Sequence, residues 1–333
     1  MYRLLSRPVL NLVMKKYLLK YKLLYLLLIQ VLGLSTAIGQ TDMDAIMMGK
    51  NRFCVGPMYS YSSWKNYWEG TLKRENLNLG TVSNQTISVM GNYGISSKLN
   101  VLFNVPYLKT KASAGTMSGV QGVQDLSLFV KWMPLEKEML GGIFSLYGIG
   151  GVSFPLTNYV ADYLPLSIGI RSKTALGRLM ADYQTGSFFV TASATYVLRS
   201  KISIDRTAYY TEELHHTNEV SVPNGGNFNF RTGFRNERLI AEAVVNSWKT
   251  YGGFDITRNN MPFPSNRMDA TTVGVNIKYV LVPNRNEISI VAGGNTTVSG
   301  RNMGQASTVY GSFFYVFDFS PKPKASDVPA QTN

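Results

Sequence analysis

Residues 308–319 of this 333-residue chain read T-V-Y-G-S-F-F-Y-V-F-D-F. Side chains of a β-strand alternate between its two faces, so the odd-numbered residues share one face and the even-numbered residues share the other. The odd face, with Val309, Phe313 and Phe317, is apolar, whereas the even face, which includes Asp318, is mixed. A soluble edge strand this apolar would invite aggregation, but a strand of a membrane barrel needs one face for lipid and one for a wet lumen. The stretch favours the closing strand of such a barrel over an internal strand of a soluble sandwich.

Eleven further stretches of the chain read as strands, most of them with the same two-residue period. In residues 99–107, for example, Val101 and Tyr107 share one face, and Asn100 and Asn104 share the other. Strict alternation of this kind is typical of half-buried strands. The strands that this reading predicts are 53–63, 82–93, 99–107, 125–132, 142–154, 175–184, 188–196, 228–235, 239–246, 272–279, 288–297 and 308–319.

The connections between these strands alternate between long and short. Bacterial membrane barrels have an even number of strands, with long loops outside the cell and short turns in the periplasm. Residues 133–140 are expected to form the longest of the short connections. The pattern predicts an all-β fold, a transmembrane antiparallel up-and-down β-barrel of about 12 strands over residues 52–319.

Aromatic residues mark both ends of the apolar faces. Tyr107 and Tyr196 are expected at the outer level, and Trp132 and Phe234 at the inner level. Membrane barrels carry such aromatic girdles where the bilayer meets water. A soluble sandwich offers no reason for this placement, so the girdles favour the barrel.

The N-terminus, residues 1–39, reads as a signal peptide. Four lysines between residues 15 and 22 precede a largely apolar run, 23–34, and the small residues Ala37 and Gly39 then form a cleavage site before Gln40. Met14 would begin a signal peptide of ordinary length, so residues 1–13 could derive from an upstream start. The alternative, a membrane anchor, requires about 20 apolar residues, and this run is shorter.

Charge and cysteine content exclude several other classes of protein. Residues 1–39 carry six basic residues and no acidic residue, so their removal lowers the net charge from +13 to +7. The remaining positive charge is scattered, which argues against nucleic acid as a partner. Cys54 is the single cysteine and excludes an intramolecular disulfide. Residues 40–51 are expected to form a short periplasmic lead, and residues 320–333 a disordered periplasmic tail.

The segment 122–132, G-V-Q-D-L-S-L-F-V-K-W, resembles the G-x-G-D motif that begins a strand in the outer-membrane proteins named for the meta pathway of phenol degradation, with Gln124 in place of the second glycine. Residues 150–155, G-G-V-S-F-P, and 167–172, S-I-G-I-R-S, fit the same family, and the resemblance covers residues 53–319. It implies an outer-membrane barrel that transports small, often aromatic or hydrophobic, compounds. It supplies no catalytic residues.

Charged residues on the mixed faces are the candidate lumen residues. A lipid-facing Arg or Lys at mid-depth would cost about 2–4 kcal/mol, so these side chains are expected to point inward. Two roles remain open, because the charges could pair and brace the wall or form a constriction that selects solutes. The candidates are Lys131, Arg178, Asp182, Arg231, Arg235, Glu242 and Lys278.

The sequence offers little support for catalysis, a metal site or a cofactor. The two histidines, His215 and His216, are adjacent in the longest loop, where a solvated polar patch is the expected reading. No G-x-S-x-G motif occurs, and no glycine-rich stretch lies between a strand and a helix.

The leading hypothesis is a passive channel for small, hydrophobic or aromatic solutes in the outer membrane of a Gram-negative-type cell. The alternatives are a non-transporting surface protein that binds a partner or ligand through its long loops, and a barrel enzyme. The expected partners are outer-membrane lipid, the barrel-assembly machinery during biogenesis and a small-molecule solute.

The signal-peptide interpretation predicts that the mature protein begins at Gln40, because Ala37 and Gly39 satisfy the small-residue rule for cleavage. Intact-mass measurement of the protein from membranes would test this. Retention of residues 23–34 would instead identify an N-terminal anchor.

Overall fold

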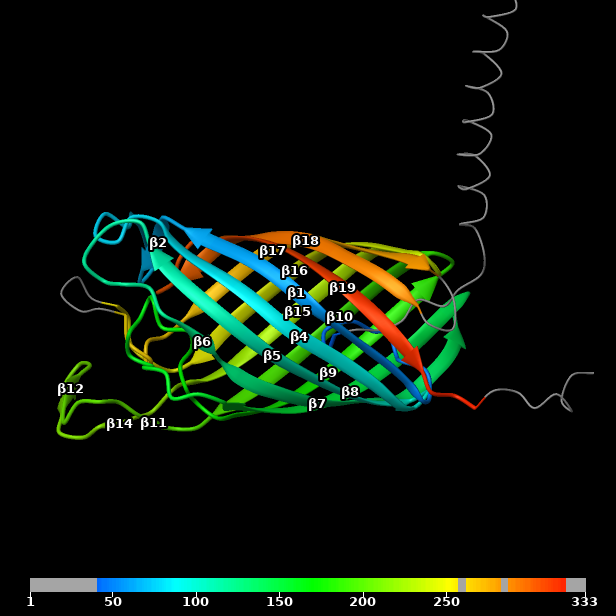
Figure 1. Ribbon diagram of the computed structural model, residues 1–333, viewed down its shortest axis with the longest axis horizontal. Coiled ribbons are helices and arrows are strands. Elements are labelled where there is room, and N and C mark those ends of the chain that lie inside the picture. Colours follow the sequence, from blue (N-terminus) through cyan, green and yellow to red (C-terminus); the bar gives the residue numbers. More distant parts are fainter. Residues whose placement is uncertain (1–40, 257–261, 283–286, 322–333) are drawn as a thin grey trace, which may run out of the picture.

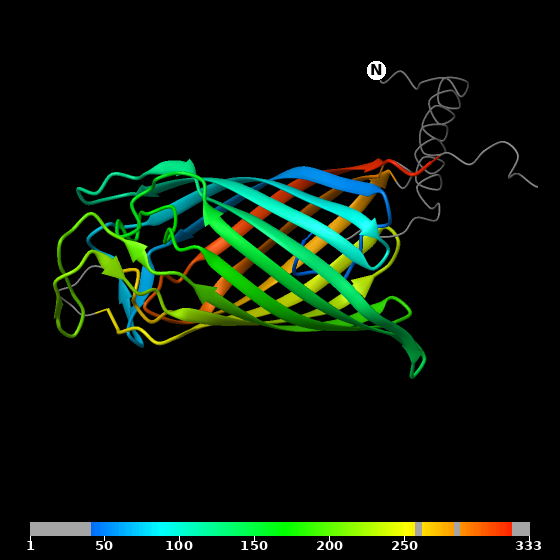
Figure 2. The same cartoon turned by 90° about the horizontal axis from the view of Figure 1, so that it is seen from below.

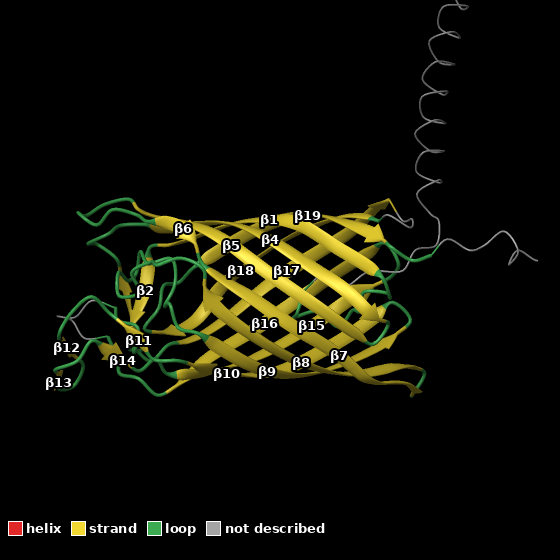
Figure 3. Ribbon diagram, turned by 60° about the horizontal axis from the view of Figure 1, so that its bottom comes forward, coloured by secondary structure: helices red, strands yellow, loops and turns green. Residues whose placement is uncertain are grey.

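A computed structural model describes residues 41–256, 262–282 and 287–321, and the signal peptide expected at 1–39, Gln40 and most of the expected tail lie outside this part. The described chain is built of strands and loops (Figure 3). No helix within it is long and apolar enough to cross a bilayer. The twelve long strands are β1 (Arg52–Trp64), β4 (Val82–Ser96), β5 (Leu99–Ala112), β7 (Asp125–Met139), β8 (Gly142–Pro155), β9 (Thr174–Thr185), β10 (Phe188–Arg199), β15 (Asn224–Arg235), β16 (Leu239–Tyr251), β17 (Asp269–Val282), β18 (Ile288–Arg301) and β19 (Ser307–Asp318).

These strands form one closed antiparallel barrel with tilted strands (Figure 1). Neighbours in the chain pair with each other, and β19 closes the sheet by pairing with both β18 and β1. At this seam β1 carries Gly56, because an added Cβ there would lie 1.9 Å from the carbonyl oxygen of Phe313. The predicted barrel of about 12 strands and the closing role of residues 308–319 are therefore confirmed.

The two faces of the wall differ as the alternation predicts. On β19 the outward side chains of Val309, Phe313 and Phe317 are 62%, 45% and 41% exposed, whereas the inward Phe314 and Val316 are buried. Exposed large apolar side chains occur on the outer side of the other long strands as well. Such a wall suits lipid outside and side-chain contacts inside.

Connections are short at one end of the barrel, called here the short-turn end, and long at the other, the long-loop end. The prediction of a connection at 133–140 was wrong, because β7 continues to Met139. The chain then turns through Leu140 and Gly141, both with positive φ. A register shift between Trp132 and Leu135 interrupts the alternation there. The break that suggested a loop is therefore a bulge within the strand.

The long loops contain seven short strands and pack against one another (Figure 2). One cluster brings Ile202 and Val220 from the longest loop against Ala161 and Phe263 from two others. These short strands are β2 (Asn66–Glu69), β3 (Leu72–Glu75), β6 (Gln121–Val123), β11 (Ile202–Ser203), β12 (Tyr209–Tyr210), β13 (Leu214–His215) and β14 (Glu219–Val220).

Hydrogen bonds tie the long loops to the barrel rim. The Tyr159 hydroxyl donates to Asp125 at 2.6 Å, and burial together with this contact raises the pKa of Tyr159, so the phenol remains a donor. Asp255 accepts from Arg301 Nε at 2.7 Å and from Asn302 at 2.6 Å, and the Arg301 contact lowers the pKa of Asp255. The loops therefore form an ordered layer over this end.

The loop lengths predict that the long-loop end faces the outside of the cell. Glu213→Cys, at an exposed hairpin position, should react with a membrane-impermeant thiol reagent on intact cells, whereas Ser97→Cys, in a short turn, should react only after lysis. The native Cys54 is buried and supplies an unreactive internal control. Labelling of Ser97→Cys alone on intact cells would reverse the orientation.

Candidate functional site: the lumen and its N-terminal segment

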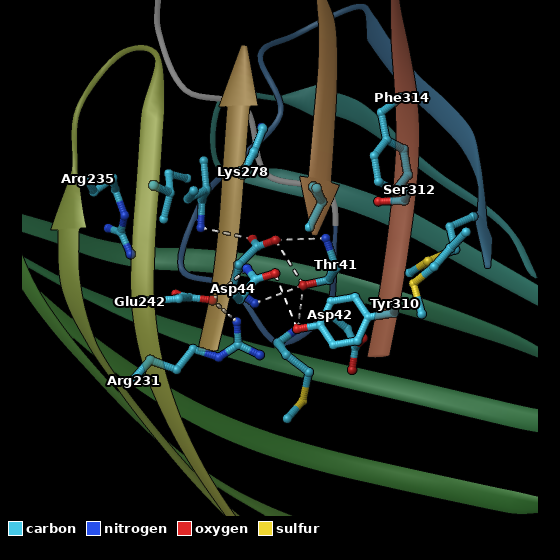
Figure 4. A pocket seen from close by; sticks show the side chains of 17 residues that line it. Thr41, Asp42, Asp44, Arg231, Arg235, Glu242, Lys278, Tyr310, Ser312 and Phe314 are labelled. Carbon is cyan, nitrogen blue, oxygen red and sulfur yellow. Dashed lines mark hydrogen bonds and ion pairs between the residues drawn. The ribbon is translucent and has the colours of Figure 1, made fainter. Parts of the chain in front are cut away.

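The chain before β1 lies inside the barrel. Residues 41–48, called here the plug segment, belong to the stretch 40–51 that was expected as a short periplasmic lead. They instead lie in the lumen towards the short-turn end, among side chains of the wall (Figures 1 and 4). They form no strand, so strand alternation gave no indication of this position.

Lys131, on β7, holds the plug segment through three acceptors. Its ammonium group donates to Asp44 Oδ1 at 2.9 Å and to the carbonyl oxygens of Thr41 and Ile46 at 2.9 and 3.1 Å. The Asp44 carboxylate also accepts from the Thr41 backbone N–H at 2.8 Å, which makes the segment turn around the lysine. The Lys131 side chain is fully buried, so its charge depends on these contacts.

Arg178, on β9, makes the second charged contact to the plug segment. Its Nη1 donates to the Asp42 carbonyl oxygen and to Asp42 Oδ2, both at 2.7 Å. Its Nε donates to Thr195 Oγ1 on β10 at 2.7 Å, which orients the guanidinium. Two basic side chains of the wall thus bind the two acidic residues of the plug segment, Asp42 and Asp44.

An apolar contact and a further hydrogen bond complete the attachment of the plug segment. Met48 is fully buried against Phe314 and Val316 on the inner face of β19. The Tyr147 hydroxyl on β8 donates to the Ala45 carbonyl oxygen at 2.9 Å. The plug segment is therefore held from opposite parts of the barrel wall.

Arg235 and Asp182 form a separate ion pair within the wall. Both terminal nitrogens of Arg235 donate to the carboxylate, at 2.9 and 3.2 Å, and Nη1 also lies 3.3 Å from Gln184 Oε1. Thr191 donates to the same carboxylate, and the guanidinium stacks 3.9 Å above the centre of the Phe189 ring. This cluster connects β9, β10 and β15.

Arg231 belongs to a second network, which crosses the lumen face of four strands. It donates to Glu242 Oε1 at 2.8 Å and to Asn229 at 2.9 Å. Asn276 donates to the same Glu242 oxygen at 2.9 Å and accepts from the Tyr310 hydroxyl at 3.3 Å. The network fixes the Arg231 side chain at the edge of a cavity.

The structure places all seven sequence candidates on the lumen side, and it pairs their charges. Lys278, the last of them, lies 3.9 Å from Glu287. Asp42, Asp44 and Glu287 were not predicted from the sequence. The seven candidates comprise five basic and two acidic residues, and this excess of three basic groups indicated further acidic residues in the lumen without identifying them.

Three cavities adjoin the plug segment, two of them along the wall formed by β15 to β19 and the third along β7 to β9. The first, of about 270 Å³, is shown in Figure 4. It shares Arg231 and Tyr310 with a cavity of about 280 Å³ towards the long-loop end. It shares Ile46 and Arg235 with a cavity of about 370 Å³ that reaches the turn at the short-turn end. The three cavities therefore lie in series beside the plug segment.

His215 packs within a hairpin of the longest loop. His215 stacks against Tyr209 with ring centres 4.8 Å apart, and its Nε2 lies 2.9 Å from Thr211 Oγ1. Within the described residues, no cluster of three His, Cys, Asp or Glu side chains could hold a metal ion. The ring contacts indicate a role in packing the hairpin.

Comparison with solved structures shows the same barrel fold in another protein. It is similar to an outer membrane channel from Pseudomonas putida F1, with a TM-score of 0.62, 13% identity, and coverage of 84% of this chain and 100% of that one. Weaker likenesses include the translocator domain of the autotransporter NalP from Neisseria meningitidis (TM-score 0.42, 10% identity, 84% and 90% covered). Another is the CymD monoaromatic hydrocarbon channel (TM-score 0.34, 10% identity, 82% and 90% covered). No family model and no curated protein matches the sequence.

The contact between Arg235 and Asp182 predicts a charge-exchange result. Arg235→Glu should destabilise the barrel by about 3 kcal/mol or more, because it leaves Asp182 buried beside a second carboxylate. The double variant Arg235→Glu/Asp182→Arg should recover most of the loss. The temperature at which the folded barrel loses its compact migration in SDS gels measures both effects. A double variant no more stable than the single one would show that the pair does not brace the wall.

Proposed function

We propose that this protein is an outer-membrane channel for the passive passage of small hydrophobic or aromatic solutes. The observation that carries the proposal is the series of adjoining cavities beside the plug segment. Barrels of eight strands are filled by side chains, and barrels of sixteen or more hold an open aqueous channel. A twelve-stranded barrel lies between these cases, so a narrow path partly filled by a segment of the chain fits its size.

The chemistry of the first cavity favours uncharged solutes. Three basic residues and three acidic residues line it, so it has little net charge to concentrate ions of one sign. Apolar side chains such as Met58, Met90 and Phe314 line the same cavity. A small solute with an apolar body could therefore replace water there at low cost. The resemblance to the phenol-degradation family points to the same class of solute.

A second candidate function is a non-transporting surface protein. The observation in its favour is the packed layer of long loops, which includes the exposed Tyr210 and Leu214 at the tip of one hairpin. Such a layer could bind a partner without any passage through the barrel. Conductance distinguishes the two functions.

The channel proposal predicts a small conductance for the purified protein in a planar bilayer, and a larger one when the plug segment is released. Asp42→Asn/Asp44→Asn removes both charged contacts to Lys131 and Arg178 with little change in side-chain volume. This variant should show a severalfold larger or strongly fluctuating conductance, because the segment no longer holds its position in the path.

Glu75→Gln is the matched control, since it removes one carboxylate from an exposed loop pair with Lys65. It should conduct like the unmodified protein. A folded, inserted protein that conducts neither before nor after release of the plug segment would favour the surface-protein function instead.

A further inference from the structure

The outer wall of the barrel carries a hollow over β8, β9 and β10, on the side opposite to the lumen. Its volume is about 750 Å³, and Trp132, Leu179 and Tyr196 rise around it, each at least 47% exposed. Gly150 and Gly177 form its floor and lie directly opposite each other on neighbouring strands. An added Cβ at either glycine would meet no atom within 4 Å.

Two other outward glycines on the wall, Gly91 and Gly226, are covered by aromatic side chains. A Cβ at Gly91 would lie 2.2 Å from the Phe103 ring, and one at Gly226 would lie 2.2 Å from the Tyr251 hydroxyl. This covering by an aromatic side chain protects the exposed backbone of a glycine in a sheet. Gly150 and Gly177 have no such cover, so their site is open to a part of another molecule.

An exposed lysine, Lys249, lies near the hollow, towards the long-loop end of the barrel. Lys249 lies on the outward face of β16, two residues before Tyr251, and is exposed. It is opposite Gly226, which is itself opposite Tyr196, and the Tyr196 and Tyr251 rings stack with centres 5.7 Å apart. Lys249 forms no ion pair with the described part of the chain. A basic side chain on a lipid-facing surface is stable near the interface, where it can reach a headgroup.

The distance from the floor of the hollow to Lys249 suits the length of a lipid molecule. Gly177, Tyr196, Gly226 and Lys249 are register partners on β9, β10, β15 and β16. Three strand spacings of about 4.8 Å separate the first from the last, or about 14 Å. An acyl chain in the hollow would therefore leave its headgroup phosphate within reach of the Lys249 ammonium group.

We infer that the hollow is a binding site for one phosphate-bearing lipid of the leaflet at the long-loop end. One acyl chain lies on Gly150 and Gly177 between the Trp132 and Tyr196 side chains, and the phosphate pairs with Lys249. The inference rests on the part of the proposed function that places the barrel in a membrane. It does not depend on transport, so the lipid site and the transport function can be disproved separately.

Quenching of tryptophan fluorescence by brominated lipid tests this site. Trp132 stands at the edge of the hollow and is 54% exposed, whereas Trp68 is buried in the loop layer and Trp248 faces the lumen beside Arg199. The full protein in maltoside micelles is titrated with phosphatidylglycerol that carries brominated acyl chains. Quenching should saturate near one lipid per protein, and Trp132→Phe should remove the saturable part.

Variants of the hollow and of the lysine separate the two parts of the site. Gly177→Leu, or Gly150→Leu if the first folds poorly, should abolish saturable quenching because the added side chain fills the space of the acyl chain. Lys249→Gln should retain quenching but require severalfold more lipid. Gly311→Leu is the matched control, because Gly311 is also an outward glycine with space for a Cβ, its nearest atom being 3.7 Å away. It should behave like the unmodified protein.

Two results would overturn the inference. Quenching that rises in proportion to the lipid content and is equal in all folded variants would show ordinary contact with surrounding lipid. A protein that is dimeric in micelles and becomes monomeric on Gly177→Leu would show that a second copy of the chain covers the hollow.

Discussion

Backbone hydrogen bonding in a medium without water is the constraint on which this structure depends. A lipid-exposed strand edge would leave a row of N–H and C=O groups unsatisfied, each at a cost of several kcal/mol by order of magnitude. Pairing of β19 with β1 removes the last edge. Closure then fixes the geometry of every other feature, because it gives each strand two neighbours and divides all side chains between lipid and lumen.

The division of side chains between lipid and lumen places the charged side chains of the wall in the lumen. Each buried charge there then needs a partner of opposite charge. Lys131 and Arg178 are buried, and neither has a carboxylate partner within the wall among its described contacts. Asp42 and Asp44 of the plug segment supply these partners. The segment is therefore held by the same requirement for pairing that links Arg235 with Asp182. Several of the charges that stabilise the lumen, among them Asp44, Arg235 and Glu242, also line its cavities.

The lumen and the outer wall use small and large side chains in different ways. Inside, polar networks such as the one around Arg231 fill space with fixed hydrogen bonds. Outside, Gly91 and Gly226 permit close contact with aromatic side chains, whereas Gly150 and Gly177 leave the backbone open. The proposed channel and the proposed lipid site therefore lie on opposite faces of one wall and depend on different residues.

The two-residue alternation determined the strands, their approximate number, the closing role of residues 308–319 and the inward direction of the seven charged candidates. These are local properties, since the pleat of a strand assigns each side chain to a face without knowledge of its neighbours. The bulge after Trp132 interrupts the alternation, and a local pattern cannot distinguish such an interruption from the end of a strand. Residues 133–140 were therefore predicted to be a loop. Only the tertiary structure decided which charges meet, because Arg235 and Asp182 are 53 residues apart and Lys131 and Asp44 are 87 residues apart. Strand register and closure set those contacts. The position of the plug segment likewise depends on strands that are distant in the sequence. The pairing of Gly150 with Gly177 depends on the register of β8 and β9, which no local pattern encodes.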